Sequence, residues 1–215
     1  FFPIGPTPLR FQATDAFGNV ATCDLVVTVI DNTPPTIVSC SSDTTINAEL
    51  NACGAHFSFA APVLSDNCIA TLVQMTGPTS GALFPIGTTT VTYRAVDAAG
   101  LADSCSFTVT VQDIHPPTFV SCPDTIVVTA DPTTCGAVVN HSPPTVTDNC
   151  TASTTLTAGP PSGATFPTGN TAITYRAFDG TNSSTCTFTV AVVDNQPPTI
   201  IGLPNNLTVP SSPGQ

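Results

Sequence analysis

Nine cysteines supply most of the reactive side chains of this 215-residue chain. Eight of them recur 82 residues apart: Cys23 and Cys105, Cys40 and Cys122, Cys53 and Cys135, and Cys68 and Cys150. So many cysteines beside one Met and no Trp indicate an oxidising compartment, in which disulfides form. Zinc is the alternative partner for cysteine, but the chain has no Cys-x-x-Cys pair. We therefore expect disulfide bridges rather than a metal–thiolate site.

Aspartates recur with the same period and are the candidate metal ligands. They are Asp31 and Asp113, Asp66 and Asp148, and Asp97 and Asp179. Carboxylate oxygens are the ligands that Ca²⁺ takes in proteins, so calcium is the cofactor to expect if the fold brings three of them together. The competing interpretation is that Asp and Asn make good turns and keep a surface soluble.

Composition excludes several classes of function. The formal net charge is -11, and the basic residues are limited to Arg10, Arg94 and Arg176. Binding to nucleic acid requires Lys and Arg to neutralise phosphates, and binding to anionic membranes requires them too. No apolar run approaches the length of a membrane span. We expect no nucleic-acid partner and no membrane insertion in this segment.

Signatures of catalysis are also missing from the sequence. The three histidines are His56, His115 and His141, and no Gly-x-Ser-x-Gly, His-Glu-x-x-His or phosphate-loop motif accompanies them. We therefore predict that the chain is not an enzyme and that the histidines are exposed or hydrogen-bonded within the fold.

An internal repeat organises the chain. Pro-Pro-Thr starts at positions 34, 116 and 197, and Phe-Pro-[Ile/Thr]-Gly starts at positions 2, 84 and 166. Both motifs have the period of the cysteines, with one residue lost shortly before Cys186. The predicted domains are residues 1–33 (the C-terminal part of one unit), 34–115 and 116–196 (two complete units), and 197–215 (the first strand of a further unit, or a linker). Phe1 is not a translation start, so we expect a processed chain or a window onto a longer one.

Each unit has the pattern of an all-β domain. "SFTVTVQD" and "TFTVAVVD" alternate with period two and predict the last strands, and "TTVTYRAVD" and "TAITYRAFD" predict the strands before them. "DTIVVTA" predicts a first strand, and Asp-Ala-Ala-Gly and Pro-Ser-Gly predict turns. About seven short strands in some 80 residues are typical of a small immunoglobulin-like sandwich. The predicted fold is all-β, with tandem immunoglobulin-like β-sandwiches in a linear beads-on-a-string array.

The ordered motifs resemble the HYR (hyalin repeat) family. They are D-x-x-P-P-T-[IF]-V-S-C, C-G-A-[HV]-[FV], D-N-C, F-P-[IT]-G, and T-Y-R-A-[VF]-D followed by C-[ST]-F-T-V. The resemblance covers nearly the whole chain, except that residues 202–215 lack the first cysteine. It implies an immunoglobulin-like fold, an extracellular or cell-surface location, an adhesive or structural role in tandem arrays, and no catalytic activity.

Four cysteines in each unit suit two bridges. The first and last strands of such a sandwich both have an end at the pole where the chain enters, which favours Cys40–Cys105 and Cys122–Cys186. Some members of the family keep only the first and fourth cysteines, as if those two pair. The remaining bridges are then Cys53–Cys68 and Cys135–Cys150. The rival scheme pairs first with third and second with fourth. Cys23 is left over, and we expect its partner outside this chain.

The same sandwich topology predicts where the recurring aspartates meet. Asp66 and Asp97 are expected to face Asp31 at one junction, and Asp148 and Asp179 to face Asp113 at the next. The linker "Asp-Asn-Thr-Pro-Pro" also resembles cadherin linkers faintly.

Attachment sites for sugars are a further expectation. Four Asn-x-Ser/Thr tripeptides begin at Asn140, Asn149, Asn182 and Asn206, the first on a strand and the others on loops or linkers. Thr44 and Thr125 each follow an aspartate at the start of a predicted strand and are candidates for O-linked sugar.

We expect a non-catalytic structural segment of a long extracellular fibre or cell-surface adhesin, whose partners are neighbouring repeats or subunits. One alternative is an extracellular module that binds surface glycans or proteins, although exposed aromatic residues are few. Another is an accessory part of an extracellular enzyme. Residues 1–31 hold final strands without first ones, so they need a partner. Covalent continuation of the chain is the favoured route, and strand addition from another subunit in a filament is the second.

Overall fold

The computed structural model describes residues 1–202 and residue 208. They divide into two compact units, Phe1–His115 and, from Pro116 onward, the remainder of the chain. The described residues form strands and turns, with no helix among them. Residues 194–202 form no strand, and the rest of the segment 197–215, including Asn206, lies outside the described residues. The all-β fold predicted from the alternating segments is therefore confirmed.

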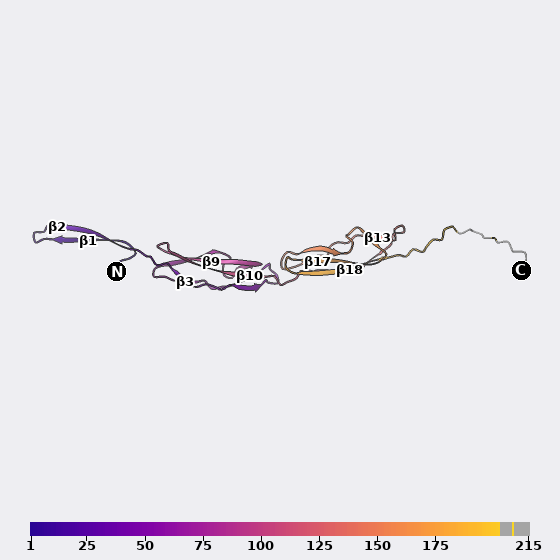
Figure 1. The fold of residues 1–215 in the computed structure, drawn as a ribbon, viewed down its shortest axis with the longest axis horizontal. Coiled ribbons are helices and arrows are strands. Elements are labelled where there is room, and N and C mark those ends of the chain that lie inside the picture. Colours follow the sequence, from indigo (N-terminus) through magenta and orange to yellow (C-terminus); the bar gives the residue numbers. More distant parts are fainter. Residues whose placement is uncertain (203–207, 209–215) are drawn as a thin grey trace. The chain divides into compact units, whose positions relative to one another are not determined.

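The first unit contains a sandwich built on a four-stranded sheet (Figure 1). The strand order is β4 (Thr44–Asn47), β10 (Ala102–Gln112), β9 (Gly87–Asp97) and β7 (Ala70–Thr76). β4 runs parallel to the end of β10, and the other neighbours are antiparallel. Two short pairs complete the sandwich, β3 (Thr36–Ser39) with β6 (Val63–Ser65) and β5 (Gly54–His56) with β8 (Leu83–Pro85). The sandwich is immunoglobulin-like.

The second unit repeats this topology strand for strand. Its four-stranded sheet has the order β12 (Ile126–Thr129), β18 (Ser183–Val193), β17 (Gly169–Phe178) and β15 (Ser153–Ala158). The short pairs are β11 (Thr118–Phe119) with β14 (Val146–Thr147) and β13 (Gly136–Val139) with β16 (Ala164–Pro167). Each sandwich has eight strands rather than about seven. The segment "DTIVVTA" contains β12, as predicted, and a further short strand precedes it, β11, which pairs with β14 as β3 pairs with β6.

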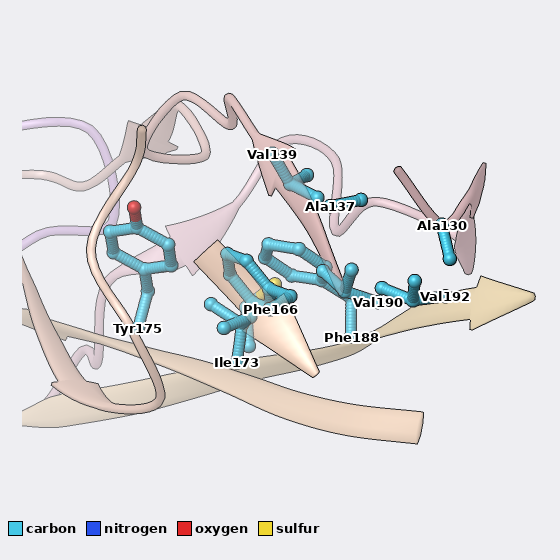
Figure 2. Close-up of a cluster of buried hydrophobic side chains, with 10 residues drawn as sticks. Ala130, Ala137, Val139, Phe166, Ile173, Tyr175, Phe188, Val190 and Val192 are labelled. Atoms are coloured by element: carbon cyan, nitrogen blue, oxygen red, sulfur yellow. The ribbon is translucent and has the colours of Figure 1, made fainter. Parts of the chain in front are cut away.

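Alternation along the last strands builds the core of each unit. On β10, Phe107, Val109 and Val111 are at most 2% exposed, because successive side chains of a strand point to opposite faces. On β18 the corresponding residues are Phe188, Val190 and Val192, which pack with residues of β13 and with Phe166 (Figure 2). Burying each such side chain stabilises the fold by about 1.5–3 kcal/mol.

The glycine of the Cys-Gly-Ala motif has a steric role in both sandwiches. A Cβ atom at Gly136 would lie 2.6 Å from the carbonyl oxygen of Phe166, and Gly54 approaches Phe84 in the same way. Without a side chain, the short strands β13 and β16 can pair at this close distance.

The repeated Pro-Pro junction has one local structure. Asp31 Oδ1 accepts a hydrogen bond from the N–H of Thr33, two residues ahead. Asp113 makes the same bond with His115, and Asp194 with Gln196. The second prolines of the first two copies, Pro35 and Pro117, are fully buried. The junction motif is therefore an Asx turn, followed in the first two copies by a proline that belongs to the core.

A hairpin precedes the first sandwich. Its strands, β1 (Gly5–Thr14) and β2 (Val20–Val29), pair antiparallel over their whole length and form a two-stranded sheet of their own. In the repeat they correspond to β9 and β10. Phe11 and Leu25 are 59% and 50% exposed, whereas Tyr93 and Phe107, 82 residues later, are 8% and 2% exposed. The face that forms the core of a sandwich is therefore open to solvent in the hairpin.

Candidate metal centre and disulfide bridges

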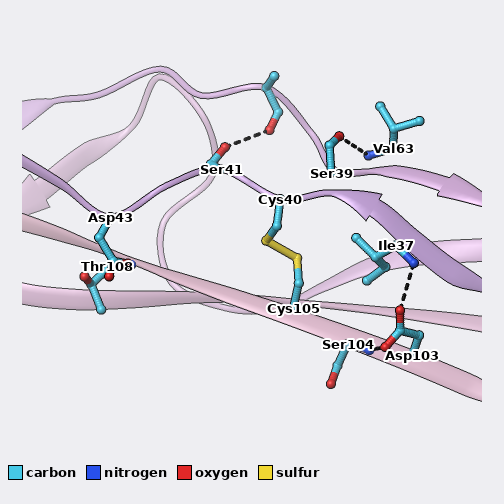
Figure 3. Close-up of a disulfide and its surroundings, with 11 residues drawn as sticks. Ile37, Ser39, Cys40, Ser41, Asp43, Val63, Asp103, Ser104, Cys105 and Thr108 are labelled. Atoms are coloured by element: carbon cyan, nitrogen blue, oxygen red, sulfur yellow. Dashed lines mark hydrogen bonds between the residues drawn. A yellow bond between two sulfur atoms is a disulfide. The ribbon is translucent and has the colours of Figure 1, made fainter.

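Each sandwich is closed by a disulfide between the end of its first strand region and its last strand. Cys40 is bonded to Cys105, with Cα atoms 6.3 Å apart (Figure 3). Cys122 is bonded to Cys186, with Cα atoms 5.7 Å apart. Figure 3 also shows Ile37 donating its N–H to the carboxylate of Asp103, beside the first bridge. These are the two outer pairings predicted from the sequence.

The two predicted inner bridges, Cys53–Cys68 and Cys135–Cys150, are wrong. Cys68 and Cys135 are free thiols in the structure, as is Cys23. Cys53 and Cys150 are disulfide-bonded, but not to these partners. The rival scheme, first with third and second with fourth, is also wrong, because it needs the same free thiols and breaks both outer bridges.

The topology explains why the inner bridges cannot form. Cys53 precedes β5 in the turn closed by Glu49 and Gly54, at the end of β10. Cys68 precedes β7, which starts opposite Asp97, at the beginning of β10. An 11-residue strand spans about 35 Å, whereas a disulfide needs Cα atoms within about 7 Å. Cys135 and Cys150 are separated along β18 in the same way.

Three aspartates from separate elements form a first carboxylate group, the Asp31 triad. Asp31 follows β2, Asp66 follows β6, and Asp97 ends β9. In each, Oδ1 accepts hydrogen bonds. The donors are the N–H of Thr33 and the side-chain amide of Asn67 for Asp31, the N–H of Asn67 for Asp66, and the N–H of Leu101 for Asp97.

The second carboxylate oxygen of each aspartate in the triad has no hydrogen-bond donor. Oδ2 of Asp31, Asp66 and Asp97 is buried and has no hydrogen-bond partner, and Asp97 as a whole is only 7% exposed. A buried carboxylate oxygen without a donor or a cation costs free energy. Turn formation accounts for the Oδ1 atoms but not for these three, so the triad presents unsatisfied negative charge.

The directions of the pKa shifts of Asp31 and Cys68 indicate that the three carboxylates lie near the Cys68 thiol. Interaction with the Cys68 thiol, then with Asn67 and Thr33, lowers the pKa of Asp31. The pKa of the Cys68 thiol is raised, first by Asp31, then by burial and by the charges of Asp31, Asp66 and Asp97. All three aspartates therefore act on one side chain. Asn67 is a contributor to this cluster that the sequence did not single out.

The corresponding second group is Asp113, Asp148 and Asp179. Each offers one carboxylate oxygen, and these oxygens lie within 4.8 Å of one another. Burial raises the pKa of Asp179, but hydrogen bonds from Asn182 and Thr181 outweigh it and lower the pKa overall. Oδ1 of Asp179 accepts both N–H groups at 2.6 Å, while its Oδ2 is buried without a partner.

The chemistry of these groups fits a hard cation. Ca²⁺ takes six to eight oxygen ligands, and three carboxylates supply up to six. Among the described residues, no other three His, Cys, Asp or Glu side chains lie as close together as Asp113, Asp148 and Asp179. The carboxylate oxygens of the Asp31 triad do not all lie within 4.8 Å of one another, so these side chains would have to move closer together to bind one ion.

The histidines have separate surroundings. His56 is exposed and pairs with Glu49 at 2.9 Å, and Nε2 of His115 lies 3.1 Å from the carbonyl oxygen of Ala48. His141 is buried and contacts Tyr175. These three contacts are to different residues, Glu49, Ala48 and Tyr175.

The predicted sugar sites differ in accessibility. Asn140 is exposed just after β13, whereas Asn149 and Asn182 are half-buried. Thr44 starts β4 and is half-buried, with its hydroxyl donating to the carbonyl of Ser42, and Thr125 is exposed. Accessibility therefore favours Asn140 and Thr125 for modification, which stays a prediction.

A search of the described residues found no helix long and apolar enough to cross a membrane. The two sandwiches and their bridges define the class of protein as a tandem of disulfide-closed, immunoglobulin-like β domains. The HYR domain family model matches residues 30–111 and 112–192. The chain belongs to the HYR domain family.

Two proteins named hyalin are similar to this chain over 93% of its length. The identity is 37% for hyalin of Strongylocentrotus purpuratus and 32% for hyalin of Lytechinus variegatus. The chain spans only 17% and 39% of those relatives. Among solved structures, the extracellular domain of protocadherin GammaB4 matches with 18% identity and a TM-score of 0.33, covering 88% of this chain and 38% of that one. The chain is an extracellular HYR repeat module.

Proposed function

We propose that the chain is a non-catalytic structural segment of a long extracellular fibre or cell-surface adhesin, whose partners are neighbouring HYR units or subunits. Two features support the proposal. Each complete sandwich has its own core and its own outer disulfide. The same Asx turn and buried proline then lead from one unit into the next. Proline fixes φ near −65° and stiffens such a joint.

The hairpin β1–β2 is the observation that carries the proposal. Its exposed face, formed by side chains such as Phe11 and Leu25, is the face that a complete unit buries. A two-stranded hairpin is marginally stable in water, and its free edges favour pairing with further strands. We infer that strands from HYR sequence outside residues 1–215 cover it. Covalent continuation of the chain is the favoured source of these strands, and addition by another subunit is the second.

Electron microscopy of the native material tests this proposal. We expect filaments with an axial repeat of about 35–45 Å per unit, from strands of about ten residues plus a linker. The mass of the non-reduced material separates a single long chain from subunits of 21.9 kDa joined by strand addition. Compact monomeric particles would contradict the proposal.

We further propose that the two aspartate groups bind calcium at the junctions. The buried, unpartnered oxygens of Asp31, Asp66, Asp97 and Asp179 support this proposal. Bound Ca²⁺ would neutralise these oxygens and hold the ends of separate elements together. A ligand present at 100 times its Kd stabilises the folded state by about 2.7 kcal/mol, so calcium is expected to raise the melting temperature.

Asp97→Asn provides the sharpest test of the first site. Asparagine can still accept the Leu101 N–H bond but removes the buried charge. By calorimetric titration of the full chain with CaCl2, we expect at least a tenfold weaker first site and no loss of stability in the absence of calcium. Asp103→Asn is the matched control, because Asp103 accepts from Ile37 and lies outside the triad. Equal calcium binding by both variants would rule out this site.

Binding of surface glycans or proteins is the second candidate function. Exposed aromatic residues are needed for such contacts, and Phe17 in the β1–β2 turn is 91% exposed. Tyr93 and Tyr175, in contrast, are buried in strands. Retention of the full chain on a glycan array, lost on Phe17→Ser, would favour this function over a purely structural one.

A further inference from the structure

Cys53 lies at the end of the first sandwich where the chain leaves it. It is part of the turn 49–54, which directly follows Ala48. The N–H of Ala48 donates to the carbonyl oxygen of Gln112, the last residue of β10. The carbonyl oxygen of Ala48 lies 3.1 Å from Nε2 of His115, just beyond β10. The turn that carries Cys53 is therefore fixed beside the junction that follows its sandwich.

Cys150 lies at the opposite end of its own sandwich, where the chain enters. Its N–H donates to Oδ2 of Asp148 at 3.2 Å. One carboxylate oxygen of Asp148 lies within 4.8 Å of one of Asp113, the first residue after β10. β11 begins at Thr118, and a linker as short as 113–117 separates the two strand ends by at most about 20 Å. The same short junction therefore lies beside Cys150.

Neither of these two cysteines is bonded within its own sandwich. Cys53 and Cys150 are both disulfide-bonded in the structure. In each sandwich two further cysteines form the outer bridge, and the remaining one, Cys68 or Cys135, is a free thiol. Cys23, in the hairpin, is free as well. Cys53 and Cys150 therefore each require a cysteine from a different unit.

Cys135 is the repeat equivalent of Cys53, at the end where the chain leaves the second sandwich. It lies in the turn 131–136 and is exposed, with a free thiol. Ala130, just before this turn, donates its N–H to the carbonyl oxygen of Val193, the last residue of β18. No cysteine follows position 186 in the sequence, so residues 1–215 hold no cysteine of a following unit.

Cys68 is the repeat equivalent of Cys150, at the end where the chain enters the first sandwich. The side-chain amide of Asn67 lies 3.3 Å from Sγ of Cys68 and 3.2 Å from Oδ1 of Asp31, which leads into this sandwich. The only cysteine before position 40 is Cys23, which corresponds to a cysteine of the outer bridges. The two free thiols of the sandwiches are therefore those whose partner unit lies outside residues 34–196.

We propose that a second kind of disulfide crosslinks consecutive units, joining the second cysteine of one unit to the third cysteine of the next. Within this chain the rule pairs Cys53 with Cys150. Cys135 then bonds the third cysteine of a following unit, and Cys68 bonds the second cysteine of a preceding one. These last two bonds rest on the proposed function, in which further HYR units adjoin the chain. The outer disulfides close single domains, whereas the crosslinks restrain the joints between them.

Formation of each crosslink is a two-electron oxidation by thiol–disulfide exchange. The thiolate of one cysteine attacks a disulfide oxidant, such as a protein disulfide or oxidised glutathione, which gives a mixed disulfide and releases one thiol. The second cysteine thiolate then displaces the other thiol of the oxidant as the new S–S bond forms. The two cysteines lose two protons and two electrons, and the oxidant is reduced to two thiols. An extracellular compartment is oxidising enough for such bonds to persist.

Peptide mapping of the non-reduced full chain tests the rule at the junction that the chain contains. Free thiols are alkylated first, and pepsin then digests the chain at low pH, where thiol–disulfide exchange is slow. By mass spectrometry we expect the peptide with Cys53 to be linked to the peptide with Cys150, and Cys68 and Cys135 to be alkylated. Any other partner for Cys53 would overturn the proposal.

Single substitutions give a second readout on the same chain. Cys53→Ser should add one alkylated thiol, at Cys150, because its partner is lost. Cys135→Ser is the matched control at the equivalent position, and it should remove one alkylated thiol and leave every link unchanged. If Cys53→Ser exposes no thiol at Cys150, the crosslink rule is wrong.

The same map of the native material tests the crosslinks to neighbouring units. Cys135 should be linked to the cysteine of an Asp-Asn-Cys sequence, and Cys68 to the cysteine of a Cys-Gly-Ala sequence. Free thiols at both positions in native filaments would overturn the proposal and leave the proposed fibre standing. If the native material forms no filaments, the proposed function fails, and the link between Cys53 and Cys150 still decides the crosslink rule.

Discussion

At the scale of single residues, the two carboxylate oxygens of several aspartates have different surroundings. In Asp31, Asp66, Asp97 and Asp179, one oxygen accepts local N–H groups and shapes a turn. The other is buried and unpartnered, which turn formation does not require. Turn chemistry and cation binding are therefore compatible interpretations of the same side chains.

Acid sensitivity below the range of histidine should come from turn aspartates such as Asp131. The hydroxyl and N–H of Thr133 bond to its carboxylate and lower its pKa. Because the folded value lies below that of the unfolded chain, the stabilisation is present above about pH 4 and is lost as pH falls through the folded value. Melting temperatures measured from pH 5 to pH 2 should fall less steeply for Asp131→Asn than for the wild type.

The exposed Asp124, in the same unit, provides the control for this measurement. Asp124→Asn should follow the wild-type curve. If Asp131→Asn gives the same slope as the wild type, the Thr133 hydrogen bonds do not favour the ionised carboxylate in solution.

At the scale of elements, the short strands of each sandwich are held in place by close backbone pairing and by the outer disulfide. β13 and β16 have only four residues each, and Gly136 lets them pair where a Cβ would meet the Phe166 carbonyl at 2.6 Å. The outer disulfides tie the first strand region to the last strand, where only a few backbone pairs would otherwise hold it.

Gly136→Ala should destabilise the second sandwich by about 1–3 kcal/mol, because the added methyl group forces β13 away from β16. Denaturant unfolding measures this difference. Val138→Ala on the same strand is the control, since Val138 is 64% exposed and its loss should cost no more than about 0.5 kcal/mol. Equal effects of the two changes would argue against the steric role of the glycine.

Removing the disulfide bridge of the second sandwich should lower its free energy of unfolding by more than Gly136→Ala does. The cysteines of Cys122–Cys186 are 64 positions apart, and the loop they close is worth about 4 kcal/mol of chain entropy. We expect Cys122→Ala/Cys186→Ala to unfold at clearly lower denaturant, with the first sandwich unchanged. Cys135→Ala, at an exposed free thiol, should leave the midpoint within about 0.5 kcal/mol. A double variant as stable as Cys135→Ala would show that the bridge contributes nothing.

At the scale of the whole molecule, the same strand pair occurs with and without a covering layer. β9 and β10 are covered by the short pairs of their sandwich, whereas β1 and β2 form a separate two-stranded sheet. The backbone pairing is equivalent, as in Thr7 with Val27 and Thr89 with Val109. A difference in stability between β1–β2 and β9–β10 therefore measures how much the other strands of a sandwich stabilise this strand pair.

Hydrogen exchange should separate these two strand pairs. In the isolated chain, amides of β1 and β2 should exchange at least about 100-fold faster than those of β9 and β10, because a lone hairpin opens locally at little cost. Mass spectrometry of peptides from the two regions measures the ratio. In native filaments, strands supplied from outside should slow exchange in the hairpin. Equal protection of both pairs in the isolated chain would contradict this expectation.

The sequence by itself determined the repeat, the strand-rich fold and the aspartates that recur at the junctions, and it favoured the two outer bridges without excluding the rival pairing. Period-two alternation in segments such as Ser106–Asp113 is a local property, and equal spacing is visible without coordinates. Only the tertiary structure decided which cysteines are within reach of each other. Cys53 and Cys68 are close in sequence, but strands that run the length of the sandwich place them at opposite ends.

Tertiary structure also decided the environment of single side chains. In the sequence, nothing distinguishes His141 from an ordinary strand histidine, and its contacts are with Pro160 and Tyr175, which are 19 and 34 positions away. The unpartnered oxygen of Asp97 depends on loops from three parts of the first unit. Periodicity predicts which face of a strand is buried, but hydrogen bonding and charge depend on which distant groups occupy the remaining space.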